Sequence, residues 1–236
     1  MNNGMVDVAK LEEISAIVSD EEKRKMGYKV KNGIYHFIKR FFDIFFSLIG
    51  LIFLLPISLI VKISYVLNKD YKSIFYKHTR IGKDGRKFGL YKFRSMVCNA
   101  DEVLKELLKD PKYKEEWNRF QKLNDDPRIT KIGKILRKTS LDELPQLFNI
   151  LKGDMSFIGP RPLVEGELDS HDGNHDIYEK VRPGLTSWWA CNGRSNLEYG
   201  ERLQLEYYYV KHQGFIMDLK CIFKTIKVVL FGNGAK

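Results

Sequence analysis

The sequence predicts an α/β fold that is predominantly helical: a compact cytosolic domain with an N-terminal re-entrant membrane helix hairpin and interfacial amphipathic helices. Three observations predict it. Residues 44–61 form a run of eighteen residues without a charge. Lysine and arginine flank this run on both sides. Most of the chain after the run places apolar residues at helical spacing.

The composition supports a folded protein with an anionic partner. The 236 residues suit one compact domain with an appendage, and 44% hydrophobic residues argue against disorder. Forty Lys and Arg against thirty Asp and Glu leave a net charge of +10, which fits nucleic acid, a lipid surface or a phosphorylated substrate. Three cysteines (Cys98, Cys191 and Cys221) form no CxxC, which argues against a disulfide framework and a thiolate zinc site.

Residues 1–36 are predicted to form an acidic amphipathic helix followed by a basic leader. Apolar residues such as Val8, Leu11 and Ile14 recur at helical spacing among acidic residues within 1–22. This pattern indicates an element for packing or for a partner, and no chemistry.

The uncharged run, IFFSLIGLIFLLPISLIV, lies within a predicted membrane helix at 37–68. A buried helix of a soluble protein is the alternative, but interior helices of this length without a polar stripe are rare. A cleaved signal peptide fits less well, because more than forty residues precede the run and no small-residue cleavage site follows it.

The charges beside the run predict how the helix meets the bilayer. Pro56 lies inside the run, where it removes a backbone donor and favours a kink or break. Lys and Arg are enriched on cytoplasmic flanks, and here they lie on both sides of the run. We therefore expect a re-entrant hairpin rather than a straight span. Asp43, near the N-terminal end, is expected to pair with Arg40 or another basic side chain at the interface.

Residues 69–236 are predicted to form the cytosolic domain. Aromatic and basic residues alternate across Ser73–Phe93 around the turn Gly82–Gly85, which indicates a hairpin. Helical patterns cover 100–123, 140–151 and 199–212. Asp218–Phe231 combines lysines with many apolar residues, so this helix either lies in the headgroup plane or packs on the domain core.

Carboxylates and arginines are the main candidates for chemistry, because GxxxxGK[ST], GxGxxG, HExxH and GxSxG are absent. Asp101 and Glu102 follow the basic segment LYKFRSM and open a helical pattern, although adjacent acids on a helix are most often only solvated. Further on, Arg128, Arg137 and Arg161 accompany Asp142 and Glu143. Arginine forks match phosphate oxygens, and carboxylates with substrate phosphates hold Mg²⁺. The pattern points to a diphosphate.

From about Arg40 to the C-terminus the chain resembles the bacterial sugar transferases, the monotopic polyprenyl-phosphate glycosyl-1-phosphate transferases. The resemblance rests on KRFFDIFFSLIGLIFLLP, YKHTRIG, LYKFRSM, the Asp101–Glu102 pair, DPRITKIGKILRKTSLDELPQLFNILKGDMSFIGPRP and VRPGLTSWWACNGR. It implies a re-entrant helix broken at Leu55–Pro56. It also implies a catalytic domain at the cytoplasmic face of the bacterial inner membrane, in the first membrane step of exopolysaccharide or capsule synthesis.

The resemblance implies a role for each site residue. Asp101 matches the nucleophile that attacks the β-phosphorus of a UDP-sugar and releases UMP, and Glu102 matches the partner carboxylate associated with Mg²⁺. The phosphosugar then passes from Asp101 to undecaprenyl phosphate. Arg94, Arg128, Arg137 and Arg161 would neutralise phosphate charge, with Lys92 and Arg80 as weaker candidates. Asp142 and Glu143 would contact the substrate or orient the arginines.

The expected partners are a UDP-sugar, undecaprenyl phosphate and an anionic lipid bilayer; a homodimer is left open. The rival functions are a non-catalytic membrane-surface adaptor and a nucleic-acid-binding protein, and the second would leave the uncharged run unexplained. The chain looks like a stand-alone catalytic unit. No motif indicates whether the sugar is galactose, glucose or an N-acetylated hexose.

Overall fold

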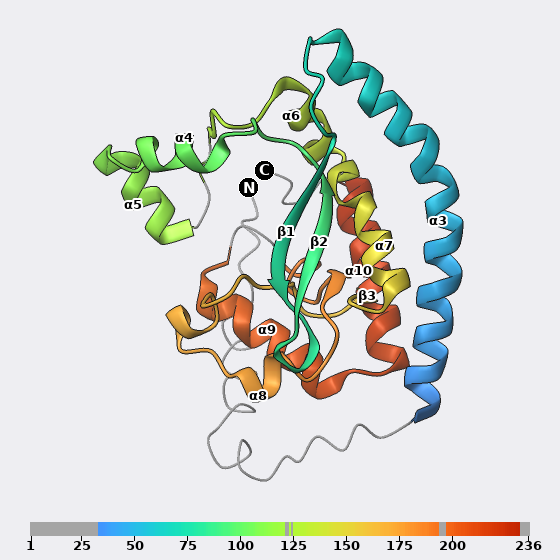
Figure 1. The fold of residues 1–236 in the computed structure, drawn as a ribbon. Coiled ribbons are helices and arrows are strands. Elements are labelled where there is room, and N and C mark those ends of the chain that lie inside the picture. Colours follow the sequence, from blue (N-terminus) through green and yellow to red (C-terminus); the bar gives the residue numbers. More distant parts are fainter. Residues whose placement is uncertain (1–32, 121–122, 124, 194–196, 232–236) are drawn as a thin grey trace. The chain divides into compact units, whose positions relative to one another are not determined.

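The computed structural model describes residues 33–120, 123, 125–193 and 197–231. It is about 58% helical, which confirms the predominance of helix. The elements in chain order (Figure 1) are α3 (Gly33–Leu67), β1 (Phe75–Ile81), η1 (Lys83–Gly85), β2 (Lys87–Phe93), α4 (Ala100–Leu107), α5 (Pro111–Phe120), α6 (Lys131–Lys138), η2 (Leu141–Gln146), α7 (Leu147–Lys152), β3 (Ser156–Ile158), η3 (Asp169–His171), α8 (His175–Tyr178), β4 (Gly184–Thr186), α9 (Tyr199–His212) and α10 (Phe215–Phe231). The helix predicted within residues 1–22 lies outside the described residues.

The described residues form two compact units. The C-terminal unit comprises 33–45, 79–88 and 152–231, apart from 194–196, and the central unit comprises 46–78 and 89–151, apart from 121, 122 and 124. Each unit is assembled from segments that are distant in the sequence. The predicted segment limits 1–36, 37–68 and 69–236 follow the membrane association of the chain rather than its contacts, and they stay a prediction.

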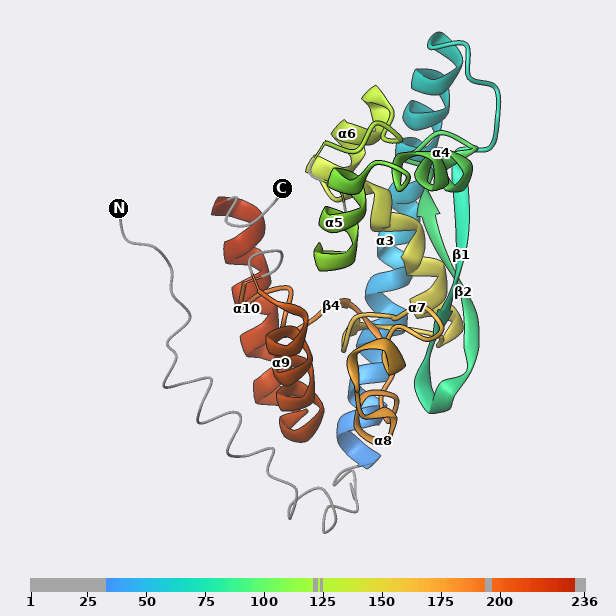
Figure 2. The same ribbon diagram turned by 90° about the vertical axis from the view of Figure 1, so that its left-hand side faces the viewer.

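The core of the C-terminal unit lies between a short parallel strand pair and two helices. Strands β3 and β4 pair with Ser156 opposite Gly184 and Ile158 opposite Thr186. A Cβ atom at Gly184 would lie 2.1 Å from the backbone nitrogen of Gly159, so only glycine allows this approach. Helices α9 and α10 follow each other in the chain (Figures 1 and 2) and bury Tyr209 and Cys221 in the same core.

Helix α10 has one face in the core and one face in solvent. Met217 and Cys221 are buried in the core of the C-terminal unit, so packing on the domain is confirmed. Ile216, Phe223 and Ile226 are 70%, 68% and 49% exposed. An apolar face left outside the core is what an interfacial helix requires, and contact of this face with lipid stays a prediction.

The core of the central unit joins the long helix α3 to β2 and α6. Its buried residues are Leu54, Val61, Tyr65, Ile74, Phe93 and Leu136. Helix α7 is held along β2 by a single side chain: the amide nitrogen of Asn149 donates to the Gly89 carbonyl over 2.7 Å, and its oxygen accepts from the Tyr91 N–H over 3.0 Å. Asn149 is fully buried, so these two bonds satisfy its polar groups inside the core.

The first part of α3 makes polar contacts within the C-terminal unit. Asp43 is 3% exposed and accepts hydrogen bonds from the Ser156 hydroxyl, over 3.1 Å, and from the Phe157 N–H, over 3.0 Å. Lys39 forms a 2.6 Å ion pair with Asp218 of α10. The β3 strand thus supplies hydrogen-bond donors to Asp43, and the nearby charges of Lys39 and Arg40 also favour its charged form, in line with the expected basic partner; the position of this group at a membrane interface stays a prediction.

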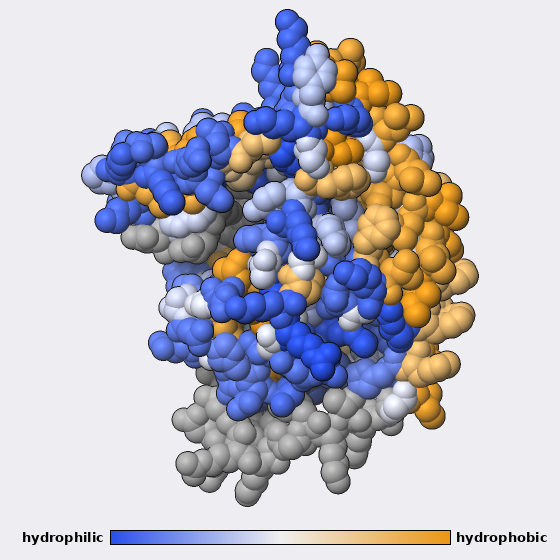
Figure 3. Space-filling model, viewed as in Figure 1, coloured by the Kyte–Doolittle hydropathy of each residue, from blue (hydrophilic) through white to orange (hydrophobic). Residues whose placement is uncertain are grey.

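Helix α3 is continuous from Gly33 to Leu67, with Pro56 inside it. Its 35 residues correspond to about 52 Å at 1.5 Å per residue, and a bilayer core is about 30 Å thick. Apolar side chains form a band along it in Figure 3, with Ile34, Leu55 and Leu67 each at least 74% exposed. Among the described residues it is the one helix long and apolar enough to cross a membrane, which by itself is a weak sign of membrane association.

The predicted break at Leu55–Pro56 is not seen as an interruption of α3. Pro56 deprives the Ile52 carbonyl of its backbone partner, but the loss of one hydrogen bond kinks a helix without reversing the chain. Leu54, Leu55 and Leu59, on both sides of Pro56, are good helix formers, and no Gly, Asn or Asp lies next to the proline. The hairpin is therefore not confirmed, and the structure has a single long helix in its place.

The other predicted elements divide into confirmed and corrected ones. The β1–β2 hairpin and helix α9 lie where the sequence predicts them. The helix predicted for 100–123 is interrupted between Leu107 and Pro111, because proline suits the first turn of a new helix and the Asp110 carboxylate caps it by accepting from the Lys112 N–H over 2.9 Å. The helix predicted for 140–151 begins instead as the 3₁₀ helix η2.

Candidate active site

Asp101 and Glu102 lie in the first turn of α4, and both are exposed to solvent. The N-terminus of a helix favours negative charge, because its first amide N–H groups have no partner within the helix. Among the residues that the structure describes, neither carboxylate has a hydrogen-bond or ion-pair partner. The two groups are therefore accessible to a ligand.

The chain segment before α4 is positioned by α6. The Thr130 N–H donates to the Ser95 carbonyl over 3.0 Å, and the Val97 N–H donates to the Arg128 carbonyl over 2.9 Å. A Cβ atom on Gly133 would lie 1.9 Å from the Ser95 carbonyl oxygen, so glycine lets α6 meet this segment directly. The structure thus brings LYKFRSM and DPRITKIGKILR together in the central unit.

Arg137 is the exposed arginine of this arrangement. It lies in the last turn of α6, and its Nε donates to the Ser95 hydroxyl over 2.9 Å. The bond fixes one side of the guanidinium group and leaves its exposed outer edge toward solvent. An arginine held in this way suits an anionic ligand.

Arg94 is buried and has structural contacts. Its Nε donates to the Ser73 carbonyl over 2.8 Å, and its Nη2 forms a 2.9 Å ion pair with Asp70. The guanidinium carbon lies 4.5 Å from the centre of the Tyr65 ring, and the Tyr65 hydroxyl donates to the Arg94 carbonyl. Arg94 therefore ties the loop after α3 to the end of β2, besides any contact with phosphate.

Arg128 forms a two-pronged ion pair with Asp126. Its Nε and Nη2 donate to the two carboxylate oxygens over 2.8 and 2.7 Å, and both side chains are buried. Burial alone would disfavour the charged carboxylate, but Arg128 holds the pKa of Asp126 below its ordinary value. The face of Arg128 lies 5.4 Å from the Trp117 ring. Most of this guanidinium group is engaged inside the protein.

The acids of LDELPQ differ in their surroundings. Asp142 is 8% exposed, and burial raises its pKa above the ordinary value. Glu143 is half-buried and accepts a 2.7 Å ion pair from Lys92 of β2. Lys92, a weaker candidate for phosphate contact in the sequence, therefore pairs with one of the predicted carboxylates. This partner is a lysine and not one of the arginines that the acidic pair is predicted to orient, so that role stays a prediction.

The carboxylates near α4 can hold a metal only together with a ligand. Within the described ranges no group of three or more His, Cys, Asp or Glu side chains could hold a metal ion. Mg²⁺ commonly takes one or two carboxylates and completes its shell with water and substrate phosphates. The exposed Glu102 fits this donor set. Glu102 also lines an open depression with Asn99, Val103, Glu106, Leu107, Asp110 and Tyr113.

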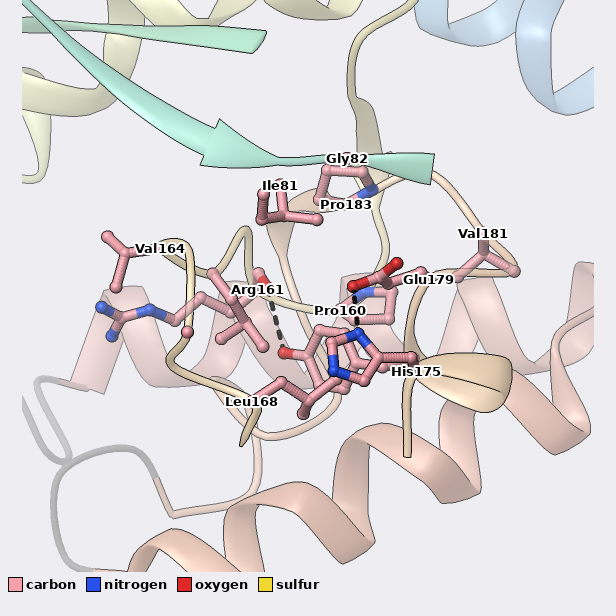
Figure 4. A pocket seen from close by; sticks show the side chains of 13 residues that line it. Ile81, Gly82, Pro160, Arg161, Val164, Leu168, His175, Glu179, Val181 and Pro183 are labelled. Atoms are coloured by element: carbon pink, nitrogen blue, oxygen red, sulfur yellow. Dashed lines mark hydrogen bonds and ion pairs between the residues drawn. The ribbon is translucent and has the colours of Figure 1, made fainter. Parts of the chain in front are cut away.

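Arg161 belongs to the C-terminal unit and is half-buried. Its backbone N–H donates to the Glu206 carboxylate over 3.1 Å, and its carbonyl accepts from the Tyr178 hydroxyl over 2.9 Å. Its guanidinium carbon lies 5.8 Å from the centre of the Trp189 ring. In Figure 4 the side chain extends away from a small cavity that its backbone helps to line.

Comparison with known proteins identifies the family. A family model described as bacterial sugar transferase matches residues 34–232. The chain belongs to the bacterial sugar transferase family. The undecaprenyl-phosphate galactose phosphotransferase of Salmonella typhimurium is 48% identical over 200 residues, which cover 84% of this chain and 42% of that protein. The exopolysaccharide production protein ExoY of Sinorhizobium fredii is 46% identical over 198 residues, which cover 84% of this chain and 87% of ExoY.

A more distant relative differs in the sugar that its name gives. The UDP-N-acetylgalactosamine-undecaprenyl-phosphate N-acetylgalactosaminephosphotransferase of Aeromonas hydrophila is 34% identical over 220 residues, or 91% of this chain and 48% of that protein. All predicted site residues of this bacterial sugar transferase lie inside the matched region.

Two residues beside Arg161 were missed by the sequence reasoning. Glu206 and Tyr178 hold the Arg161 backbone, and both are buried. A signal for Glu206 exists, because it stands at helical spacing between the apolar residues Leu203 and Val210 and so occupies a core-facing position of α9. Tyr178 lies in a helix of four residues, which is too short for periodicity to indicate its inward face.

Proposed function

We propose that the chain transfers a sugar-1-phosphate from a UDP-sugar to undecaprenyl phosphate and releases UMP. The proposal is carried by one observation: a pair of adjacent, exposed and unpartnered carboxylates, Asp101 and Glu102, in a chain 46–48% identical to relatives with undecaprenyl-phosphate sugar transfer or exopolysaccharide production in their names. A galactosyl donor is the first to test, because the Salmonella relative is named for galactose.

Asp101 acts as the nucleophile in this proposal. One of its carboxylate oxygens forms a bond to the β-phosphorus of the donor, the bond from that phosphorus to the bridging oxygen breaks, and UMP leaves with that oxygen and its electron pair. An oxygen of undecaprenyl phosphate then bonds to the same phosphorus. The bond to Asp101 breaks, which restores the carboxylate. The exposure of Asp101 in the first turn of α4 supports this role.

The other site residues neutralise the negative charge of the substrate phosphates in this proposal. Two anionic substrates, the UDP-sugar and undecaprenyl phosphate, must approach the Asp101 carboxylate. Cationic groups are therefore needed before and during transfer. Arg137, exposed and held by Ser95, belongs to the same unit as Asp101 and suits this task, and the resemblance to the family assigns Arg161 to it as well. Mg²⁺, when bound at Glu102, would neutralise diphosphate charge.

We place the reaction at the cytoplasmic face of a bacterial inner membrane, with the chain monotopic. Helix α3 supplies the apolar surface; Lys62 lies near its C-terminal end, and Lys69, Lys72 and Lys77 follow it. Because basic residues also precede α3, a helix that enters and leaves at one face keeps both flanks in the cytoplasm. This topology needs a bend in α3, and we assign it to Leu55–Pro56, where the helix lacks one backbone donor; in the bilayer the bend must exceed the kink that this missing donor produces by itself.

The test of the function is replacement of Asp101 by Asn in the full-length protein in detergent. The change keeps the size of the side chain and removes its negative charge, so sugar-phosphate transfer should fall by about three orders of magnitude. Mixing the unaltered protein with UDP-galactose and Mg²⁺, without acceptor, should release about one UMP per protein and leave a phosphosugar on Asp101. Glu115→Gln, an exposed acid of α5 outside the depression that Glu102 lines, serves as the control and should keep activity.

Two outcomes would contradict the proposal. UMP that appears only when undecaprenyl phosphate is added would indicate direct transfer without an enzyme-bound sugar. Full activity of the Asp101→Asn variant, or no transfer from any UDP-sugar, would remove the catalytic function and favour an adaptor at the membrane surface.

A further inference from the structure

The loop that carries Arg161 has its backbone fixed from four directions. Its carbonyls accept from the Gly184 N–H (Pro160, 2.8 Å), the Tyr178 hydroxyl (Arg161, 2.9 Å), Nη1 of Arg80 (Pro162, 3.2 Å) and the Ile81 N–H (Leu163, 2.8 Å). Proline has no N–H, so the Arg161 N–H is the one backbone donor within Pro160–Pro162. It donates to the Glu206 carboxylate.

The backbone N–H and the carbonyl of Arg161 are hydrogen-bonded to side chains and not to a neighbouring strand. Tyr178 comes from α8 and Glu206 from α9, and the two helices pack on each other in the C-terminal unit. The flanking prolines fix φ on either side of Arg161. The backbone at Arg161 is thereby held in place, which fixes the direction in which its side chain leaves the chain.

Glu206 is a buried carboxyl group, and its burial must be compensated by the groups around it. Its side chain is fully buried, and burial raises its pKa to about 7. Moving a carboxyl group out of water destabilises the fold unless its oxygens are bonded. The Glu206 carboxyl group accepts from the Arg161 N–H over 3.1 Å, and the Ser187 hydroxyl and the charge of Arg202 also favour its charged form.

The small cavity beside this loop is too small to explain why the Arg161 backbone is bonded by two buried side chains. It has a volume of about 30 Å³, enough for about one water molecule. Figure 4 shows the Arg161 side chain extending away from it. The guanidinium group lies near the Trp189 ring, so the feature that the fixed backbone orients is the Arg161 side chain.

We propose that Glu206 and Tyr178 are positioning residues that hold Arg161 ready to bind a phosphate group of the sugar-nucleotide substrate. The inference rests on the proposed function, which gives Arg161 its phosphate. An arginine that is ordered before binding loses less conformational entropy when its two donors meet phosphate oxygens. The effect of both residues on the substrate is therefore transmitted through Arg161.

The experiment measures kcat/KM for the UDP-sugar with full-length protein in detergent. Tyr178→Phe removes only the hydroxyl that donates to Arg161, and Glu206→Gln keeps an acceptor of the same size. Tyr207→Phe is the matched control, because the Tyr207 hydroxyl accepts from the Asn174 N–H over 2.7 Å in the same core and, among the described residues, is not hydrogen-bonded to the Arg161 loop. Melting temperatures record the stability of each variant.

We expect Tyr178→Phe to lower kcat/KM for the donor about tenfold, mainly through KM, and Glu206→Gln to lower it less. Tyr207→Phe should lower the melting temperature similarly and leave kcat/KM unchanged. In an Arg161→Ala background, Tyr178→Phe should have no further effect, since its action passes through Arg161.

The outcomes separate this inference from the proposed function. If Arg161→Ala weakens donor use but Tyr178→Phe behaves like Tyr207→Phe, or adds its full effect to Arg161→Ala, positioning is refuted while the function stands. If Arg161→Ala leaves kcat/KM unchanged in an active enzyme, the phosphate contact of Arg161 is wrong, and positioning falls with it. If the unaltered protein transfers no sugar phosphate, the proposed function itself has failed.

Discussion

Buried charged side chains in this protein are bonded either to the backbone or to an opposite charge. Arg128 pairs with Asp126, and Arg94 with Asp70 and the Ser73 carbonyl. An unpaired buried charge would cost several kcal/mol, so these arginines stabilise the fold whatever else they do. The arginines that remain best suited to bind substrate are the exposed Arg137 and the half-buried Arg161.

Glu206 should make the stability of the protein depend on pH. Burial raises its pKa from the ordinary 4.5 to about 7, so between these values the folded chain holds a proton that the unfolded chain releases. Stability should therefore fall as the pH rises from about 4.5 to 7, and this contribution should level off above 7. Glu206→Gln cannot titrate, and its thermal unfolding should lack that part of the slope.

Thermal unfolding of both proteins in detergent between pH 5 and 8 checks this expectation. His175, whose pKa is raised by hydrogen bonds to Asp169 and Glu179, also loses stabilising charge as the pH rises, but it is present in both proteins and cancels in the difference. Parallel curves for the two proteins would show that Glu206 keeps one protonation state across this range.

At the scale of elements, the contact of α6 with the Ser95 segment depends on Gly133. Replacing Gly133 by Ala places a methyl group 1.9 Å from the Ser95 carbonyl oxygen, which is backbone and has no side-chain freedom to give way. Helix α6 must shift, so we expect a loss of about 1–3 kcal/mol in stability. The shift should also break the bond from Arg137 to Ser95 and lower transferase activity.

Gly200→Ala provides the control for that change. Gly200 lies in the first turn of α9, and no atom lies within 4 Å of its added Cβ. Alanine is a better helix former than glycine, so this variant should be as stable as the unaltered protein or slightly more stable. Denaturant unfolding compares the two variants, and equal stability would show that α6 tolerates the methyl group.

At the scale of the whole molecule, the topology of α3 determines where the reaction takes place. Single cysteines at Lys31 and Lys69, in a Cys98→Ser background, test whether both flanks are cytoplasmic. An impermeant thiol reagent should label neither position in intact spheroplasts and both after lysis. Labelling of one position from outside would mean that α3 crosses the bilayer and that the monotopic topology is wrong.

Pro56→Leu tests the cause of that topology. Leucine restores the backbone donor to Ile52 and removes the steric clash within α3, so a fraction of molecules should change to a spanning orientation and label on one flank. Unchanged labelling would show that the basic flanks alone keep both ends of α3 on one side.

Several features of the molecule follow from local sequence alone. The apolar run, the β1–β2 hairpin and α9 are local, because spacing of apolar residues, turn glycines and the Glu198–Glu201 capping box act over a few residues. The placement of Asp101 and Glu102 in the first turn of a helix is local for the same reason. Family membership is also determined by the sequence, since it rests on residues and their order.

Only the tertiary structure decided which charges are engaged within the fold. The sequence presents Arg94, Arg128, Arg137 and Arg161 as four similar candidates, whereas the structure buries the first two in ion pairs and leaves Arg137 exposed. It also brings Glu206 to Arg161, 45 residues away along the chain. Such contacts depend on which helices pack together, because burial and long-range pairing set the energy of a charge, and no local pattern of residues contains that information.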